Sequence, residues 1–347
     1  RGQDVPLLER RSAPMAKKPD ETTPRHALTA GARTPSLDAD RPIKRSTDDR
    51  FGRAAFATVV AHHVGSAADG QSLVFALVGP WGAGKTSVLN MTEERLVEAG
   101  VEVVWFNPWM FTGTEQIATQ FMRELAVHLG SKASSFGRVG EYIETYGRLL
   151  EVGGSAFALS ALAAGLPAWS VIPGLASAGL ASAVGNAFKS VPRESVRETR
   201  QRVEKALRDA GRRIVIVVDD IDRLDGDEIR LMFKMVRLVA DFPNVSYVLA
   251  FDRPRVERAL GNEDMTGRAY LAKIVQASFD LPPLDPDILA RLLPKELERC
   301  LSGRLHGPFH VRAWQDIFVR VVRPLIKHPR DVSRYLTAVL PAVDMLG

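Results

Sequence analysis

Residues 79–86 read Gly-Pro-Trp-Gly-Ala-Gly-Lys-Thr, which matches the Walker A pattern of a phosphate-binding loop in full. A continuous apolar run over residues 73–78 precedes the loop, and apolar side chains at helical spacing follow it. Backbone N–H groups at the start of a helix bind phosphate oxygens, so a loop between a strand and a helix suits such binding. We expect nucleotide phosphates to lie against Gly79, Pro80, Trp81, Gly82, Ala83, Gly84, Lys85, Thr86 and Ser87.

A second apolar run supplies the acids that such a loop needs. Within the loop, Lys85 would place its charge on the β and γ phosphates, and the Thr86 hydroxyl would bind Mg²⁺. Residues 214–218 form the apolar run and end in Asp219 and Asp220, the end of a parallel strand at which ligands bind. We predict that Asp219 holds Mg²⁺ through water. Asp220 would then orient and polarise the attacking water.

Arginines near the end of the next apolar run and near the end of the chain could add positive charge. Arg253 follows residues 245–251 and either reaches a neighbouring subunit's nucleotide or forms an ion pair on a solvated loop. Arg330 opens a helical pattern; it or Arg334 either closes over the triphosphate or pairs with Asp331. The catalytic candidates are therefore Lys85, Asp220, Arg253 and Arg330.

The paired acids are followed by a short charged segment, residues 221–225. Its Arg223 either reaches the phosphates or pairs with Asp222 or Asp225. Small-molecule kinases use the same phosphate-binding loop, but they need an acceptor pocket and mobile arginine-rich lids. The acids of this segment suit activation of water better than transfer to an acceptor, so a kinase is the alternative. A protein that binds nucleotide without hydrolysing it is a further alternative, which the paired acids disfavour.

Apolar runs of strand length alternate with helical patterns, which predicts an α/β fold: a P-loop NTPase parallel sheet sandwiched by helices. The expected strands are residues 73–78, 101–106, 214–218, 245–251 and, with a weaker pattern, 274–279. The strand before the loop and the strand before the acids are far apart in sequence. We therefore expect another strand to lie between them in the sheet. Beyond residue 283 only helical patterns occur, over residues 288–301, 311–325 and 330–340.

Changes in composition along the sequence suggest that the chain has three regions. Residues 1–45 are rich in charged residues, Pro, Ser and Thr without apolar periodicity, which is typical of a disordered tail or linker. Structure is expected to begin at residues 46–49, whose polar side chains can cap a first helix. We predict a P-loop NTPase core over residues 46–284 and a C-terminal helical lid over residues 285–347.

The net charge and the cysteine content limit the cellular compartment and the kinds of partner that the chain can have. A single cysteine, Cys300, excludes a disulfide scaffold and fits a reducing, cytoplasmic compartment. The net charge of +5 permits a nucleic-acid partner without requiring one. The basic stretch over residues 193–213 also carries acids at helical spacing, which is typical of a solvated, self-paired helix. A DNA-associated motor ATPase is thus an alternative, with nucleic-acid contact not excluded.

Residues 152–188 contain no charged side chain and are rich in Ala, Gly, Ser and Leu. A turn-like segment around Trp169 divides them, which predicts an apolar helical hairpin inserted in the core. The stretch approaches the length of two membrane spans, and basic residues flank both ends on what would be one side. The hairpin therefore either enters a bilayer, giving inner-membrane association, or is buried against protein.

Taken together, the motifs resemble those of the KAP family of P-loop NTPases. The resemblance rests on residues 79–86, 106–109 (Phe-Asn-Pro-Trp), 218–223 (Val-Asp-Asp-Ile-Asp-Arg), 250–253 (Ala-Phe-Asp-Arg) and 329–334 (Pro-Arg-Asp-Val-Ser-Arg). It covers about residues 47–340, which is nearly all of the chain beyond the tail.

The resemblance implies a relative of the STAND and AAA-like switch ATPases. It makes ATP and Mg²⁺ the expected cofactors and implies slow hydrolysis that controls assembly or an attached effector domain. It also implies a homo-oligomer in which Arg253 or Arg330 acts on a neighbour's nucleotide. Many members of the family carry a transmembrane hairpin where residues 152–188 lie, and bacterial members are associated with phage exclusion. We expect an ATP-driven switch, with anti-phage defence as its setting.

Overall fold

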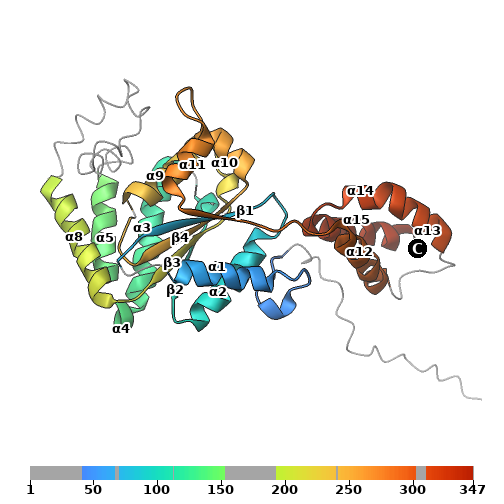
Figure 1. Ribbon diagram of the computed structural model, residues 1–347, viewed down its shortest axis with the longest axis horizontal. Helices are drawn as coiled ribbons and strands as arrows, with labels where there is room; N and C mark the ends of the chain where they lie inside the picture. Colours follow the sequence, from blue (N-terminus) through green and yellow to red (C-terminus); the bar gives the residue numbers. More distant parts are fainter. Residues whose placement is uncertain are drawn as a thin grey trace, which may run out of the picture. The chain divides into compact units, whose positions relative to one another are not determined.

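A parallel sheet lies within the part of the chain that the computed structural model describes: residues 41–66, 70–111, 113–152, 193–239, 241–301 and 310–346 (Figure 1). These residues belong to one compact unit, Leu37–Gly347. The strands are β1 (Leu73–Val78), β2 (Glu102–Phe106), β3 (Ile214–Val218), β4 (Val245–Phe251) and β5 (Ala277–Asp280). Their order is β2-β3-β4-β1-β5, and each neighbouring pair is parallel. The predicted α/β fold is confirmed.

The strand order also confirms that another strand separates the phosphate-binding loop from the paired acids. β4 lies between β1 and β3, so the ends of those two strands are about 10 Å apart across the sheet. Side chains can span that distance. The weakest predicted strand is displaced: β5 begins at Ala277, because Ile274 is instead the buried last residue of a helix.

Helices cover both faces of the sheet (Figure 1). On one face lie α1 (Ala54–Gly65) and α2 (Lys85–Glu98), which pack on Phe75 and Leu77 of β1. The intervening residues Val74, Ala76 and Val78 pack on the other face. The helices of that face are α3 (Thr114–Ser131), α4 (Ala133–Phe136), α5 (Val139–Val152), α8 (Arg193–Ala210), α9 (Gly226–Lys234), α10 (Arg253–Leu260) and α11 (Gly267–Ile274). Burial on both faces explains the continuous apolar runs.

The polar cluster at residues 46–49 caps the first helix as predicted, mainly through Asp49. Ser46–Asp48 form a short 3-10 turn, and α1 begins at Ala54. The carboxylate of Asp49 accepts hydrogen bonds from the backbone N–H groups of Phe51 (3.0 Å) and Ala54 (2.7 Å). These bonds satisfy donors at the start of the helix, which have no intrahelical partner.

The C-terminal residues are helical, as their pattern predicts. The elements are α12 (Pro286–Leu301), α13 (Val311–Ile317), a π-helical turn (Phe318–Val322), α14 (Arg323–Leu325) and α15 (Pro329–Leu346). They share an apolar core of their own that includes Leu289, Leu293, Val322, Val332 and Leu336. We call these helices the lid. The division of the chain at residue 284 stays a prediction.

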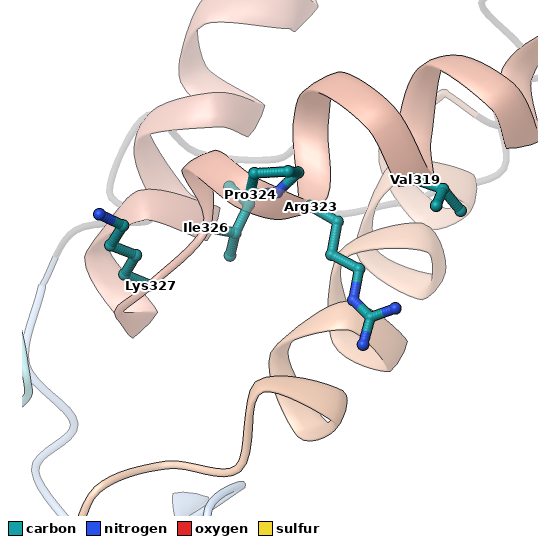
Figure 2. Close-up of a pocket in the computed structure, with 5 residues that line it drawn as sticks. All are labelled: Val319, Arg323, Pro324, Ile326 and Lys327. Carbon is teal, nitrogen blue, oxygen red and sulfur yellow. The ribbon is translucent and has the colours of Figure 1, made fainter.

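A hollow of about 510 Å³ lies among the lid helices, lined by Val319, Arg323, Pro324, Ile326 and Lys327 (Figure 2). Arg323 also pairs with Asp287 at 2.7 Å. None of the residues that the sequence assigns to nucleotide binding lines this hollow. It is therefore separate from the candidate site.

Two sequence predictions fall outside the described residues. The predicted tail does so except for residues 41–45, and the apolar segment 152–188 does so except for Val152, the last residue of α5. Among the helices that the structure does describe, none combines the length and the apolar character that crossing a bilayer requires. Membrane contact through residues 152–188 stays a prediction.

Candidate nucleotide-binding site

The phosphate-binding loop joins β1 to α2 with the backbone shape that phosphate binding needs. Gly82 and Gly84 have φ angles of 78° and 96°, in the left-handed region that favours glycine. Lys85 is the first residue of α2. The first N–H groups of a helix lack intrahelical partners, so α2 directs donors and the positive end of its dipole toward the loop.

Lys85 is buried, and its charge is balanced within the chain. Its Nζ donates a hydrogen bond of 3.0 Å to the carbonyl of Gly79 and lies 3.5 Å from the Asp222 carboxylate. Asp222 is buried as well. The sequence pattern assigned Lys85 to phosphates and considered Asp222 only as a partner of Arg223. The ion pair with Asp222 was not predicted, since the two residues are far apart in sequence.

The two predicted magnesium ligands are in contact. Thr86 donates a hydrogen bond of 2.6 Å from its Oγ1 to Asp219 Oδ2. Burial raises the pKa of the Asp219 carboxyl above its usual range, although the hydrogen bond from Thr86 lowers it. A hydroxyl and one carboxylate fit Mg²⁺, which typically takes one or two carboxylates and completes its shell with phosphates and water. Among the described residues no cluster of three or more His, Cys, Asp or Glu could hold a metal.

The carboxylate of Asp220, the predicted water-orienting acid, is held from two sides. Asn107, which follows β2, donates a hydrogen bond of 3.1 Å to Asp220 Oδ2. Arg223 forms an ion pair of 2.8 Å with Oδ1, and its guanidinium lies 4.8 Å from the Trp109 ring centroid. Asp220 has a φ of 61°, a left-handed conformation that Asp adopts more readily than most residues. The predicted pairing of Arg223 with Asp222 or Asp225 is wrong, because the turn after β3 brings Arg223 back onto Asp220.

Arg253 is directed toward β5. It is the first residue of α10 and donates a hydrogen bond of 2.6 Å to the hydroxyl of Ser278. It also lies 3.3 Å from the carboxylate of Asp280 and 3.9 Å from that of Glu257. Of the two sequence alternatives, the contacts within one chain favour a surface ion pair. Action on a neighbouring subunit's nucleotide stays a prediction.

Arg330 and Arg334, from the first two turns of α15, both lie against the phosphate-binding loop. Their guanidinium carbons are 4.3 Å and 4.6 Å from the ring centroid of Trp81. The carboxylate of Asp331 accepts hydrogen bonds from the backbone N–H groups that precede the helix, at Lys327 (2.9 Å) and His328 (2.8 Å). The structure thus places both arginines beside the loop, as closure over a triphosphate would require.

Two further side chains tie the loop to its surroundings. Ser87, predicted to contact phosphate, accepts a hydrogen bond of 3.3 Å from the backbone of Ile43 with its Oγ. Arg53 is buried and donates hydrogen bonds to the carbonyls of Ala83 and Pro282, the latter at 2.8 Å. Burial lowers the pKa of this guanidinium. Arg53 therefore links the loop to the segment that leads into the lid. The sequence carries no motif that marks it.

Solved structures with a similar arrangement include two from Aeropyrum pernix. The ORC2 protein, in ADPNP–ADP complexes, has a TM-score of 0.42 and 11% identity, and the match covers 89% of this chain and 66% of that one. The ORC1 protein in complex with DNA has a TM-score of 0.41 and 14% identity, with coverage of 90% and 65%. This chain thus covers just under two thirds of each.

A curated relative and a family domain also match. The Phage T7 exclusion protein of Escherichia coli (strain K12) is 26% identical over 272 residues, which are 70% of this chain and 34% of that protein. The chain therefore spans about a third of that relative's length. The KAP family P-loop domain matches residues 53–342, from the start of α1 into α15. Since this match covers most of the sequence, the chain belongs to the KAP family of P-loop NTPases.

Proposed function

We propose that this chain binds and hydrolyses Mg-ATP at the loop after β1 and uses the nucleotide to control its conformation. One observation carries the proposal. The Thr86 hydroxyl, from the start of α2, and the Asp219 carboxylate, from the end of β3, meet at 2.6 Å beside the buried Lys85. Sites that transfer phosphoryl groups combine these three chemical groups.

Each residue of the site would have a distinct task. Lys85 would bind the β and γ phosphates and give up part of its contact with Asp222. Thr86 and Asp219 would hold Mg²⁺, which neutralises charge on the phosphates. Asp220 would accept a hydrogen bond from the attacking water and orient it in line with the γ phosphate. Its carboxylate is already directed by Asn107, so little reorientation would be needed.

The charge on the transferred phosphoryl group would be stabilised further by arginines. Arg330 and Arg334 lie at the tip of the loop and could reach the γ phosphate from the lid. Arg253 would act only in a homo-oligomer, after leaving Ser278 and Asp280. An arginine supplied from a neighbour would make hydrolysis depend on assembly.

Part of the positive charge of α8 is paired within the helix, which weakens the alternative of a DNA motor. Arg200 and Arg208, in the basic stretch of the sequence, lie 2.9 Å and 3.6 Å from the carboxylate of Glu204 on the same helix. Arg200 also donates to the carbonyl of Asp241 at 3.0 Å. Side chains engaged in this way present less charge to phosphates of nucleic acid. A DNA-associated role is therefore not favoured.

The biological setting follows only from the relative. That protein is described as excluding phage T7, and we infer that anti-phage defence is the setting of this switch as well. The chain covers 34% of that relative, and we infer that an effector domain or a partner protein delivers the output of the switch. A cytoplasmic location, with inner-membrane association through residues 152–188, completes the proposal.

Four variants test the proposal. ATP affinity is measured by calorimetry, and phosphate release is measured with and without Mg²⁺. We expect Lys85→Ala to lose binding, and Thr86→Ala to lose most phosphate release at the Mg²⁺ concentration that saturates the parent protein. Asp220→Asn should bind ATP normally while hydrolysis falls about 100-fold or more. Asp227→Asn, an exposed acid beyond the site, serves as the control and should match the parent protein.

The hydrolytic assignment fails if Asp220→Asn hydrolyses ATP at the parent rate. The binding assignment fails if Lys85→Ala binds ATP as tightly as the parent protein does. Removal of Mg²⁺ with a chelator should abolish phosphate release and leave at most weak binding. Phosphate release that persists after chelation would contradict the role given to Thr86 and Asp219.

A further inference from the structure

Trp81 occupies a variable position of the loop pattern, yet it makes the contacts that join the loop to the lid. Trp81 is 45% exposed, and the guanidinium carbons of Arg330 and Arg334 lie 4.3 Å and 4.6 Å from the centroid of its ring. The two arginines are one helical turn apart on α15, so they share a face of that helix. One indole ring thus receives two cations from a single lid helix.

Gly82, which follows Trp81, lets the side chain of Arg330 approach the loop closely. A Cβ placed on Gly82 would lie 3.2 Å from Cβ of Arg330 and 3.5 Å from its Cδ. The aliphatic stem of Arg330 therefore rests on the loop backbone beside Trp81. Its charged end then lies over the ring. This geometry needs both the missing side chain at Gly82 and the ring at Trp81.

The Trp81 ring offsets the electrostatic repulsion between the lid arginines and the phosphate-binding loop. The start of α2 directs the positive end of its dipole toward the loop, so two cations beside it would be repelled. The face of an indole ring is negative and attracts a guanidinium. Trp81 can therefore hold Arg330 and Arg334 at the loop without a triphosphate to attract them.

We propose that Trp81 is a positioning residue that holds Arg330 and Arg334 of the lid beside the phosphate-binding loop, ready to meet the triphosphate. The inference rests on the proposed nucleotide-binding function. A lid held in place in advance loses less freedom when ATP binds, so affinity rises. Once the triphosphate is bound, its own negative charge attracts the arginines. Trp81 thus affects ATP binding more than the hydrolytic step.

Substitutions at Trp81 test the proposal through binding. We expect Trp81→Leu to weaken ATP binding about tenfold, because two weak cation–π contacts together amount to that factor. Trp81→Phe keeps an aromatic face and should fall between Leu and the parent protein. KM should rise by a similar factor to the dissociation constant, with a smaller change in kcat. Calorimetry measures the affinity and phosphate release measures KM and kcat.

A double-mutant cycle separates positioning from a general effect on the fold. In the parent protein Arg334→Ala should weaken ATP binding several-fold, whereas in the Trp81→Leu background it should weaken binding less. Arg320→Ala, a lid arginine whose side chain is 79% exposed, is the matched control and should leave ATP affinity unchanged in both backgrounds. Hydrogen exchange without nucleotide should rise over residues 327–336 in Trp81→Leu.

Additive effects of Trp81→Leu and Arg334→Ala, together with unchanged hydrogen exchange over residues 327–336, would overturn the proposal. So would Trp81→Leu binding ATP as tightly as the parent protein. These outcomes are distinct from failure of the proposed function. If the proposed function fails, the parent protein itself does not bind ATP. A chain that binds ATP without hydrolysing it still allows the cycle and the exchange measurement to decide.

Discussion

Asn107 donates a hydrogen bond of 3.1 Å from its side-chain amide to the carboxylate of Asp220. The other oxygen of that carboxylate pairs with Arg223 at 2.8 Å. Asn107 also accepts a hydrogen bond from the backbone N–H of Trp109, which fixes its own orientation. The loop after β2 therefore sets the direction in which Asp220 points, although the two residues are far apart in sequence.

Removing this contact should slow hydrolysis without weakening binding. In Asn107→Ala, Asp220 keeps only the contact with Arg223 and can turn toward it, away from the attacking water. We expect kcat to fall roughly tenfold to a hundredfold, since a general base gives about 10²–10⁴ and only its orientation is lost. ATP affinity should change less than twofold. Steady-state hydrolysis and calorimetry measure the two quantities.

Gln116→Ala is the control for Asn107→Ala, because Gln116 is an exposed amide on α3. It should leave kcat unchanged. An equal loss of ATP affinity and kcat in Asn107→Ala would show a damaged fold and contradict the positioning role. An unchanged kcat would show that the direction of Asp220 does not limit hydrolysis.

The ion pair of Lys85 with Asp222 predicts a stability effect that ATP should repair. Both side chains are buried, and their charged atoms are 3.5 Å apart. In Asp222→Ala the Lys85 charge loses its counterion, and loss of one partner of a buried pair costs about 3–5 kcal/mol. Because the two charged atoms are as far apart as 3.5 Å, we expect a loss of stability at the lower end of this range. For a domain of this size, that loss corresponds to a drop in Tm of roughly 6–12 °C. Thermal unfolding checks the shift.

In the proposed function ATP supplies negative charge to Lys85, so ATP should raise the Tm of Asp222→Ala more than that of the parent protein. Asp264→Asn, in an exposed loop, is the control and should follow the parent protein. Equal nucleotide-induced shifts in Asp222→Ala and the parent protein would mean that Asp222 does not balance the Lys85 charge.

Much of this arrangement can be predicted from the sequence because the signals are local. The run before Gly79 is apolar on both faces, and β1 is buried on both faces as a result. The acids at Asp219 and Asp220 follow a second such run, and the parallel sheet brings them to the same edge as Thr86. Periodicity and motif spacing are sufficient for these elements.

The partners of individual side chains could not be predicted in this way. Arg53 bonds to the carbonyls of Ala83 and Pro282, but nothing in the local sequence distinguishes it from a surface arginine. Asn107 belongs to a motif that carries the family resemblance, yet its bond to Asp220 appears only once β2 lies beside β3. Such contacts depend on the packed structure, because they join residues that no local pattern relates.

Two glycines, each the first residue of a helix, provide a test of stability in which one serves as the control for the other. Gly267 and Gly226 are the first residues of α11 and α9. A Cβ on Gly267 would lie 1.8 Å from the carbonyl oxygen of Glu257, whereas a Cβ on Gly226 would meet nothing within 4 Å. Gly267→Ala should therefore move α11 away from α10 and lower the free energy of unfolding by about 3 kcal/mol or more.

Gly226→Ala should leave stability unchanged or raise it by about 0.5 kcal/mol, because alanine restricts the unfolded chain more than glycine does. Urea unfolding of the two variants measures the difference. If the variants lose equal stability, the close approach of α10 and α11 at Gly267 is wrong. A loss in Gly226→Ala alone would contradict the open space beside that residue.

Buried tyrosines predict that the protein unfolds at high pH. Burial raises the pKa of Tyr146 to about 12, and it raises the pKa of Tyr270 to about 12 as well. In the unfolded chain both hydroxyls ionise near pH 10, so the unfolded state releases protons first as the pH rises. Their contribution to stability is complete below pH 10 and is lost between pH 10 and about 12. The loss is roughly 2–3 kcal/mol for each side chain.

Tyr270→Phe removes one of these ionisations and should unfold at higher pH than the parent protein. Circular dichroism follows unfolding, and the absorbance of tyrosinate follows ionisation in the same titration. The part of the tyrosinate signal that is missing in Tyr270→Phe belongs to Tyr270. It should appear together with unfolding in the parent protein, because the ionised side chain cannot stay buried. If that part appears near pH 10 while the fold persists, the Tyr270 hydroxyl reaches solvent in the native state, which would contradict the burial on which the prediction depends.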